Sequence, residues 1–93
     1  MPNNNEKIAK DKLELAFDNF ALLKSTLNNF SNEELLSMSS SIRNNIKNDS
    51  CISLECKNNK EIAGLRKSLL DKINTLQKNI FEDITQTEST IAF

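Results

Sequence analysis

Residues 62–84, IAGLRKSLLDKINTLQKNIFEDI, carry the longest regular apolar pattern in the chain. Its aliphatic side chains follow one another in steps of three or four residues, which is the spacing of one face of an α-helix. These side chains are Ile62, Leu65, Leu69, Ile73, Leu76, Ile80 and Ile84. The pattern predicts a long C-terminal helix, about 35 Å over this segment at about 1.5 Å per residue.

The composition extends this prediction to the whole chain. Glycine and proline occur once each, and valine, tyrosine and tryptophan are absent, although strands and tight turns favour these residues. A chain of 93 residues has room for one domain. We therefore expect a single all-α domain over residues 1–93, with three or four helices arranged as a bundle or as an interlocked dimer.

The first part of the chain has a helical pattern of its own. From Glu6 onward, apolar residues recur mostly at three- and four-residue steps. They are Ile8, Leu13, Phe17, Phe20, Leu23, Leu27 and Phe30. Asp18 and Asn19 prefer helix ends, so we expect a break there that leaves two short helices. The terminal residues 1–5 and 86–93 are expected to be flexible, with Asn4 or Asn5 capping the first helix.

The clearest local signal lies at Ser31. Ser31 and Glu34 have the spacing of a capping box, in which each side chain binds the backbone N–H of the other residue. A second helix with a narrow apolar stripe should follow, and Asn58 with Glu61 predicts another cap before the long helix. Residues 47–59 are open between a loop, a strained continuation of the second helix and a short strand.

Charge and hydropathy argue against several classes of partner. The chain has 12 basic and 13 acidic residues, evenly spread, so it lacks the basic arm expected of a nucleic-acid binder and the polybasic patch of a membrane-surface protein. No apolar run is long enough to span a bilayer, and the start lacks a signal-peptide pattern. The expectation is a cytoplasmic protein without direct nucleic-acid or membrane contact.

Catalytic, metal and cofactor signatures are missing as well. Histidine is absent, and a single glycine cannot build a phosphate-binding loop. Cys51 and Cys56 lie five residues apart, which is not a zinc or redox spacing, and we expect two reduced thiols. The sequence predicts no enzyme, no catalytic residue, no metal and no cofactor.

The length of the apolar stripe from Ile62 to Ile84, which we call the seam, suggests a protein partner. The second helix is much shorter than this seam and cannot cover all of it, and uncovered apolar strips usually mark binding sites. We therefore expect a second chain to cover part of the seam; the alternative is a three-helix bundle in which the first two segments cover it. The predicted interface comprises Leu23, Leu27, Phe30, Leu35, Met38, Ile42, Leu65, Leu69, Ile73, Leu76 and Ile80.

Residues 13–46 also match an ungapped family pattern. The matching residues are Asn19, Phe20, Leu23, Lys24, Phe30, Ser31, Glu33, Leu35 and Met38. With them the segment resembles the N-terminal dimerisation module of the H-NS family of bacterial nucleoid-structuring proteins. The resemblance implies two short helices followed by a longer one that interlocks with a second chain, with the interface at Leu23, Leu27, Phe30, Leu35, Met38 and Ile42. The family's charged run after the module and its DNA-binding segment are absent, so DNA binding is not implied.

These observations favour a small helical protein-interaction module that self-associates or joins a partner. Such a module would act in the manner of a truncated H-NS-like regulator that enters the assemblies of its full-length relative. The alternative is a small helical chaperone or inhibitor, of the secretion-chaperone or phage-encoded type, that masks a target protein.

Overall fold

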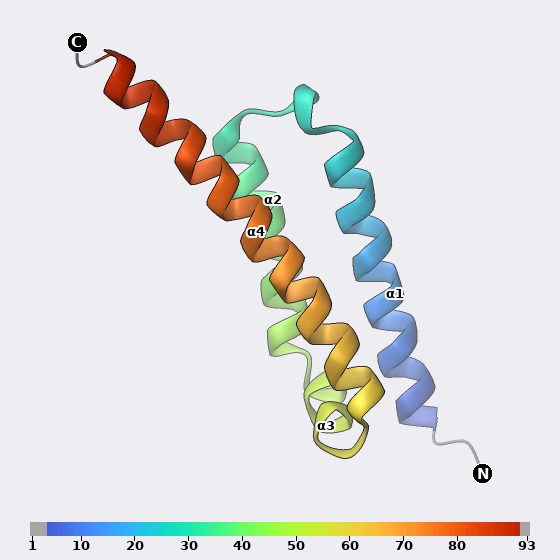
Figure 1. Cartoon of the computed structure of the whole chain (residues 1–93). Coiled ribbons are helices and arrows are strands. Elements are labelled where there is room, and N and C mark those ends of the chain that lie inside the picture. The colour runs from blue at the N-terminus through green and yellow to red at the C-terminus, as the bar shows by residue number, and fades with distance from the viewer. Residues whose placement is uncertain (1–3, 92–93) are drawn as a thin grey trace.

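The computed structural model describes the backbone of residues 4–91 and the side chains of residues 4–83. Within this range the chain forms four α-helices and one 3₁₀ turn, and no strand (Figure 1). The elements are α1 (Asn4–Ser25), η1 (Leu27–Asn29), α2 (Asn32–Asn48), α3 (Ser50–Asn58) and α4 (Lys60–Ile91). The predicted all-α class is confirmed.

Helix α1 is continuous through Asp18 and Asn19, so the predicted break is wrong. Both residues are exposed, whereas Leu13 before them is completely buried and Phe20 and Leu23 after them are 3% and 6% exposed. The weak helix propensity of two surface residues is outweighed because the apolar face on either side of them is buried.

The turn into α2 confirms the predicted capping box. The Ser31 hydroxyl accepts the N–H of Glu34 at 3.1 Å, and the Glu34 carboxylate accepts the N–H of Ser31 at 3.1 Å. The hydrogen bond from the Ser31 N–H to the carboxylate, together with that from the Ser31 side chain, lowers the pKa of Glu34. Ser31 has an extended backbone, and so does Phe30 before it, so the chain reverses direction here and α2 runs back along α1.

Residues 47–59 contain a separate short helix, α3, with its own N-cap at Asp49, so all three alternatives, a loop, a continuation of the second helix and a strand, are wrong. The Asp49 carboxylate begins this helix by accepting the N–H of Ile52 at 3.0 Å. The Asn59 side chain begins α4 by accepting the N–H groups of Glu61 and Ile62 at 2.9 and 3.3 Å. The cap before α4 is therefore one residue later than predicted.

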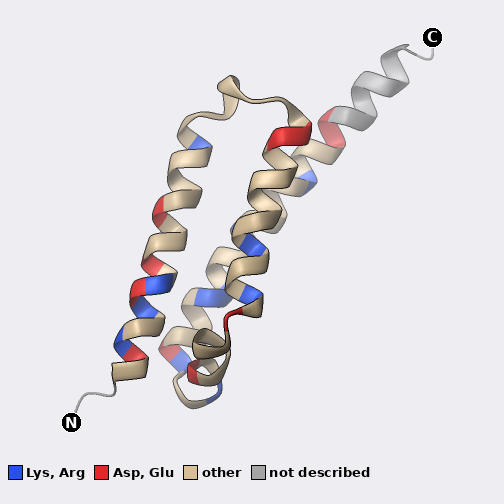
Figure 2. Cartoon of the chain, turned by 180° about the vertical axis from the view of Figure 1, so that it is seen from behind, with Lys and Arg blue, Asp and Glu red and all other residues tan. Residues whose placement is uncertain are grey.

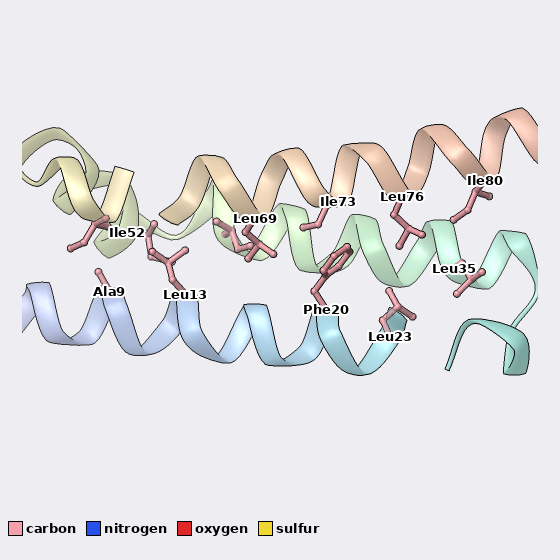
Figure 3. Packing of buried hydrophobic residues seen from close by; sticks show 12 residues of the cluster. Ala9, Leu13, Phe20, Leu23, Leu35, Ile52, Leu69, Ile73, Leu76 and Ile80 are labelled. Carbon is pink, nitrogen blue, oxygen red and sulfur yellow. The ribbon is translucent and has the colours of Figure 1, made fainter. Parts of the chain in front are cut away.

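Helices α1, α2 and α4 lie side by side, and α3 closes the end of the bundle where α4 begins (Figure 1). Their apolar faces meet in one core (Figure 3). The buried hydrophobic residues are Ala9, Leu13, Phe20, Leu23, Leu35, Ile46, Ile52, Ile62, Leu69, Ile73, Leu76 and Ile80. Burial of this surface is what holds helices of ordinary propensity in place.

The helices reach close to both chain ends. Helix α1 begins at Asn4, and α4 runs through Ile91, so helical backbone enters the segments 1–5 and 86–93, whose flexibility stays a prediction. Residues 1–3 and 92–93 lie outside the described residues. The last turns of α4 pass beyond the turn that joins α1 and α2 (Figure 1).

Candidate protein-interaction surface

The seam of α4 is covered by the chain itself. Leu69 and Ile73 are completely buried, and Leu76 and Ile80 are 9% and 6% exposed, with no second chain present. The expectation that the chain cannot cover its own seam is therefore wrong for these residues. The short α2 helix alone could not cover the seam, but the 22-residue α1 helix also packs against α4.

The other predicted interface residues fall into three groups. Leu23 and Leu35 are buried in the core. Leu27, Met38, Ile42 and Leu65 are partly buried and pack against the core. Phe30 is 37% exposed at the turn between α1 and α2. The structure therefore separates the predicted set into a core and a few residues that reach the surface.

An apolar groove lies between α1 and α2. It consists of two adjoining hollows that share Asn19, Ile42 and Asn45 in their linings, and we call it the α1–α2 groove. Its apolar lining comprises Leu15, Ala16, Leu22, Leu23, Phe30, Met38, Ile42, Ile46 and Ile52. Leu15 and Leu22 are 62% and 65% exposed, which makes them the most exposed large hydrophobic residues among the described side chains.

The polar residues of this groove are mostly neutral. Asn19, Thr26, Ser41 and Asn45 stand among the apolar side chains. The charged members of the lining, Lys12 and Asp49, neutralise each other in an ion pair of 2.9 Å. The groove thus offers apolar contact and a few amides and hydroxyls, which suits the apolar face of another polypeptide better than a charged ligand.

The Lys12–Asp49 pair also joins α1 to the start of α3. Burial alone would raise the pKa of Asp49, but the hydrogen bonds from the Lys12 ammonium and from the N–H of Ile52 outweigh it and lower this pKa. The hydrogen bond to Asp49 raises the pKa of Lys12. Both groups are therefore held in their charged forms at neutral pH.

Leu15 and Leu22 are not among the interface residues predicted from the sequence. Together with Ile8, which is 43% exposed, they form a second stripe on α1 with a spacing of seven residues. Seven residues are about two helical turns, so the three side chains lie on one side of the helix, beside its buried face. In the sequence, this surface could have been recognised because α1 carries a second row of aliphatic residues besides the row that forms the core.

The remaining candidate groups do not form a reactive cluster. Cys51 and Cys56 are free, half-buried thiols on α3, and the Cys51 thiol donates to the carbonyl of Asn5 at 3.5 Å. Among the described residues no three His, Cys, Asp or Glu side chains come together as a metal site. Within the same residues no helix has a stretch long and apolar enough to cross a membrane.

Comparison with protein-family models, curated proteins and solved structures finds no match to this chain. The resemblance of residues 13–46 to the H-NS dimerisation module therefore stays a prediction. Where the resemblance implies two short helices followed by a longer one, the structure has the single helix α1, the η1 turn and the 17-residue helix α2.

Proposed function

We propose that this chain is a non-enzymatic protein-interaction module whose α1–α2 groove binds an apolar helical segment of another polypeptide. The observation that carries the proposal is the exposure of Leu15 and Leu22 along a groove floored by apolar side chains. Two large aliphatic side chains that are more than half exposed on the same side of a helix leave apolar surface in water, which association would remove.

The dimensions of the groove suit a helix. Its lining extends from Lys12 on α1 to Thr26, the residue after this helix, which corresponds to about 21 Å at about 1.5 Å per residue and to a partner helix of about four turns. Helices α1 and α2 pack against α4 on one side and have the groove on another. A partner helix in the groove would lie beside α1 and α2 and would be the fourth long helix with α1, α2 and α4, as in a four-helix bundle.

The proposal includes self-association and association with a different protein. Phe30, Met38 and Ile42 belong both to the groove and to the interface that the H-NS resemblance implies, which supports a role as a truncated regulator that joins the assemblies of a longer relative. A chaperone or inhibitor that masks a target helix would use the same groove. The two roles differ in the partner, so the binding experiment must identify it.

The test uses substitutions that leave the net charge unchanged. Leu15→Ser and Leu22→Ser remove apolar surface from the groove, and Leu54→Ser, at a residue of α3 that is 53% exposed and outside the groove, is the matched control. We expect sedimentation equilibrium at micromolar concentration to show a dimer that only the groove variants weaken, or affinity capture from a bacterial lysate to yield a protein that only the groove variants lose.

Two results would refute the proposal. One is a wild-type chain that is monomeric up to roughly 100 micromolar and captures no protein. The other is a complex that Leu15→Ser and Leu22→Ser weaken no more than Leu54→Ser does. Circular dichroism of each variant establishes that the helices are intact, which is expected because all three leucines are largely exposed.

A further inference from the structure

A second groove, between α2 and α4, concentrates positive charge. Four cations line it, and they are Arg43, Lys47, Arg66 and Lys67. Arg43 and Arg66 are the only arginines in the chain, whose net charge is −1. The carboxylate in this lining is Asp71, and the other members are Ala63, Leu70 and Asn74. We call this surface the basic groove; Figure 2 shows the basic turns of α2 and α4 beside one another.

The arginines of the basic groove are oriented by neutral acceptors. Arg43 donates to the Gln77 side-chain oxygen at 2.9 Å, and Arg66 donates to the Ser53 hydroxyl at 3.5 Å. Both arginines are half-buried, and neither makes an ion pair within 4 Å in the part of the chain that the structure describes. Their positive charge is therefore positioned but not neutralised, as in sites that bind carboxylates.

The exposed side of α1 carries the opposite charge. Asp11, Glu14 and Asp18 follow one another at intervals of three and four residues, so they form one acidic ridge along the helix. All three are exposed, and none is in an ion pair with another described residue. The two lysines that flank Asp11 in the sequence are engaged elsewhere: Lys10 pairs with Glu6 and Glu61, and Lys12 with Asp49.

The ridge and the basic groove cannot meet within one molecule. Helix α1 packs against α2 and α4, yet no residue of α1 lines the basic groove, because this groove opens on the other side of that helix pair. The ridge is nevertheless short enough to lie within the groove. It covers the eight residues from Asp11 to Asp18, or about 10 Å, and the groove follows α4 from Ala63 to Asn74, or about 16 Å.

We infer that the acidic ridge of one copy docks into the basic groove of a second copy. The occupant is assigned to this chain because the chain itself presents three exposed carboxylates that make no ion pair with a described residue, in a row short enough to lie within the groove. The contact joins two different surfaces, so it is heterologous and leaves a free ridge and a free groove on every dimer. Assembly consequently continues beyond the dimer. Exposed charge pairs are individually weak, so the association is dynamic and sensitive to salt.

This contact uses other residues than the apolar α1–α2 groove and has the opposite salt response. Raising the salt concentration from about 0.01 M to about 1 M shortens the Debye length from about 30 Å to about 3 Å and should dissociate the charged contact. Apolar association is not weakened by such screening. Failure of one proposal can therefore be told apart from failure of the other.

The test is a charge exchange in the full chain. One variant reverses the ridge (Asp11→Lys, Glu14→Lys, Asp18→Lys) and the other reverses the exposed lysines of the groove (Lys47→Glu, Lys67→Glu). By sedimentation velocity in about 0.01 M salt, the wild type should form species larger than a dimer that dissociate in about 1 M salt. Each variant alone should lose these species, and an equimolar mixture of the two should regain them.

A control variant, Lys57→Glu with Lys78→Glu, changes the net charge by the same amount as the groove variant, at exposed residues outside both surfaces, and should assemble as the wild type does. The inference is overturned if the wild type sediments as a monomer or a closed dimer at low salt. It is also overturned if the mixture of reversed variants does not assemble, or if the control loses assembly as they do. A monomer that binds a fluorescent polyglutamate peptide would assign the groove to a foreign acidic segment and would equally overturn it.

Discussion

The substitution Leu69→Ala separates a core position from an interface position. The sequence pattern assigned Leu69 to a contact with another chain, whereas the structure buries it completely within its own chain. Truncating a fully buried leucine costs about 2–5 kcal/mol, because the transfer free energy of the removed atoms is lost and a cavity remains. A domain of 93 residues has a total stability of about 5–14 kcal/mol, at about 0.05–0.15 kcal/mol per residue. The single change should therefore remove a large fraction of the free energy of unfolding.

Urea denaturation followed by circular dichroism measures this loss. With an m-value of about 1–3 kcal/mol/M for a small domain, the midpoint should fall by roughly 1–3 M. The matched control is Leu54→Ala, because Leu54 is 53% exposed and its truncation should change stability by less than about 0.5 kcal/mol. Each protein is measured at two concentrations about a hundredfold apart, since only the stability of an oligomer depends on concentration.

Two outcomes would refute the reasoning. A loss smaller than about 1 kcal/mol would mean that Leu69 is not enclosed as the structure has it. A wild-type midpoint that rises with protein concentration, together with a Leu69→Ala midpoint that does not, would return Leu69 to an interface between chains.

Two further predictions concern the helix caps. Ser31→Ala should lower the free energy of unfolding by about 1 kcal/mol, while Ser31→Asp should retain most of it, because aspartate also accepts the N–H of Glu34; urea midpoints measured side by side would contradict this if both changes had equal effects. The pKa of Asp49 is lower in the folded state than in the unfolded state. The ionised Asp49 carboxylate therefore stabilises the fold above its unfolded-state pKa, and this stabilisation is lost as pH falls through the lower folded-state pKa. Lys12→Met should therefore reduce the loss of stability below about pH 4, and an unchanged profile of midpoint against pH would exclude this ion pair as a cause.

The sequence predicted the features that depend on neighbours along the chain. The seam of α4 was recognisable because a helix face is a fixed spacing of residues, whatever packs against it. The capping box at Ser31 was recognisable for the same reason, since both of its hydrogen bonds connect residues three positions apart. Such signals do not need knowledge of the tertiary fold.

The sequence could not predict which neighbouring helix, if any, covers each helix face. Asp18 and Asn19 favour a break, but the buried residues on both sides of them keep α1 continuous, so packing overrides local preference. The same is true of the seam, because its covering depends on how α1 lies against α4. The exposure of Leu15 and Leu22 could not be predicted from the sequence, because a leucine next to the core stripe is exposed or buried depending on where the neighbouring helix packs.

The buried polar group Gln77 connects the packing of the helices with the basic groove. An aliphatic seam alone tolerates a shift of α2 along α4, because one Leu or Ile contact can replace another. Gln77 is 8% exposed and donates to the hydroxyls of Ser39 and Ser40 at 3.0 and 2.9 Å while it accepts from Arg43, so a shift of one turn would leave a buried amide without its partners. These hydrogen bonds thus favour one register of α2 on α4. Because Arg43 takes part in them, the same register fixes the guanidinium at the edge of the basic groove, so the polar contact that aligns the two helices also positions the charge that we assign to the second copy.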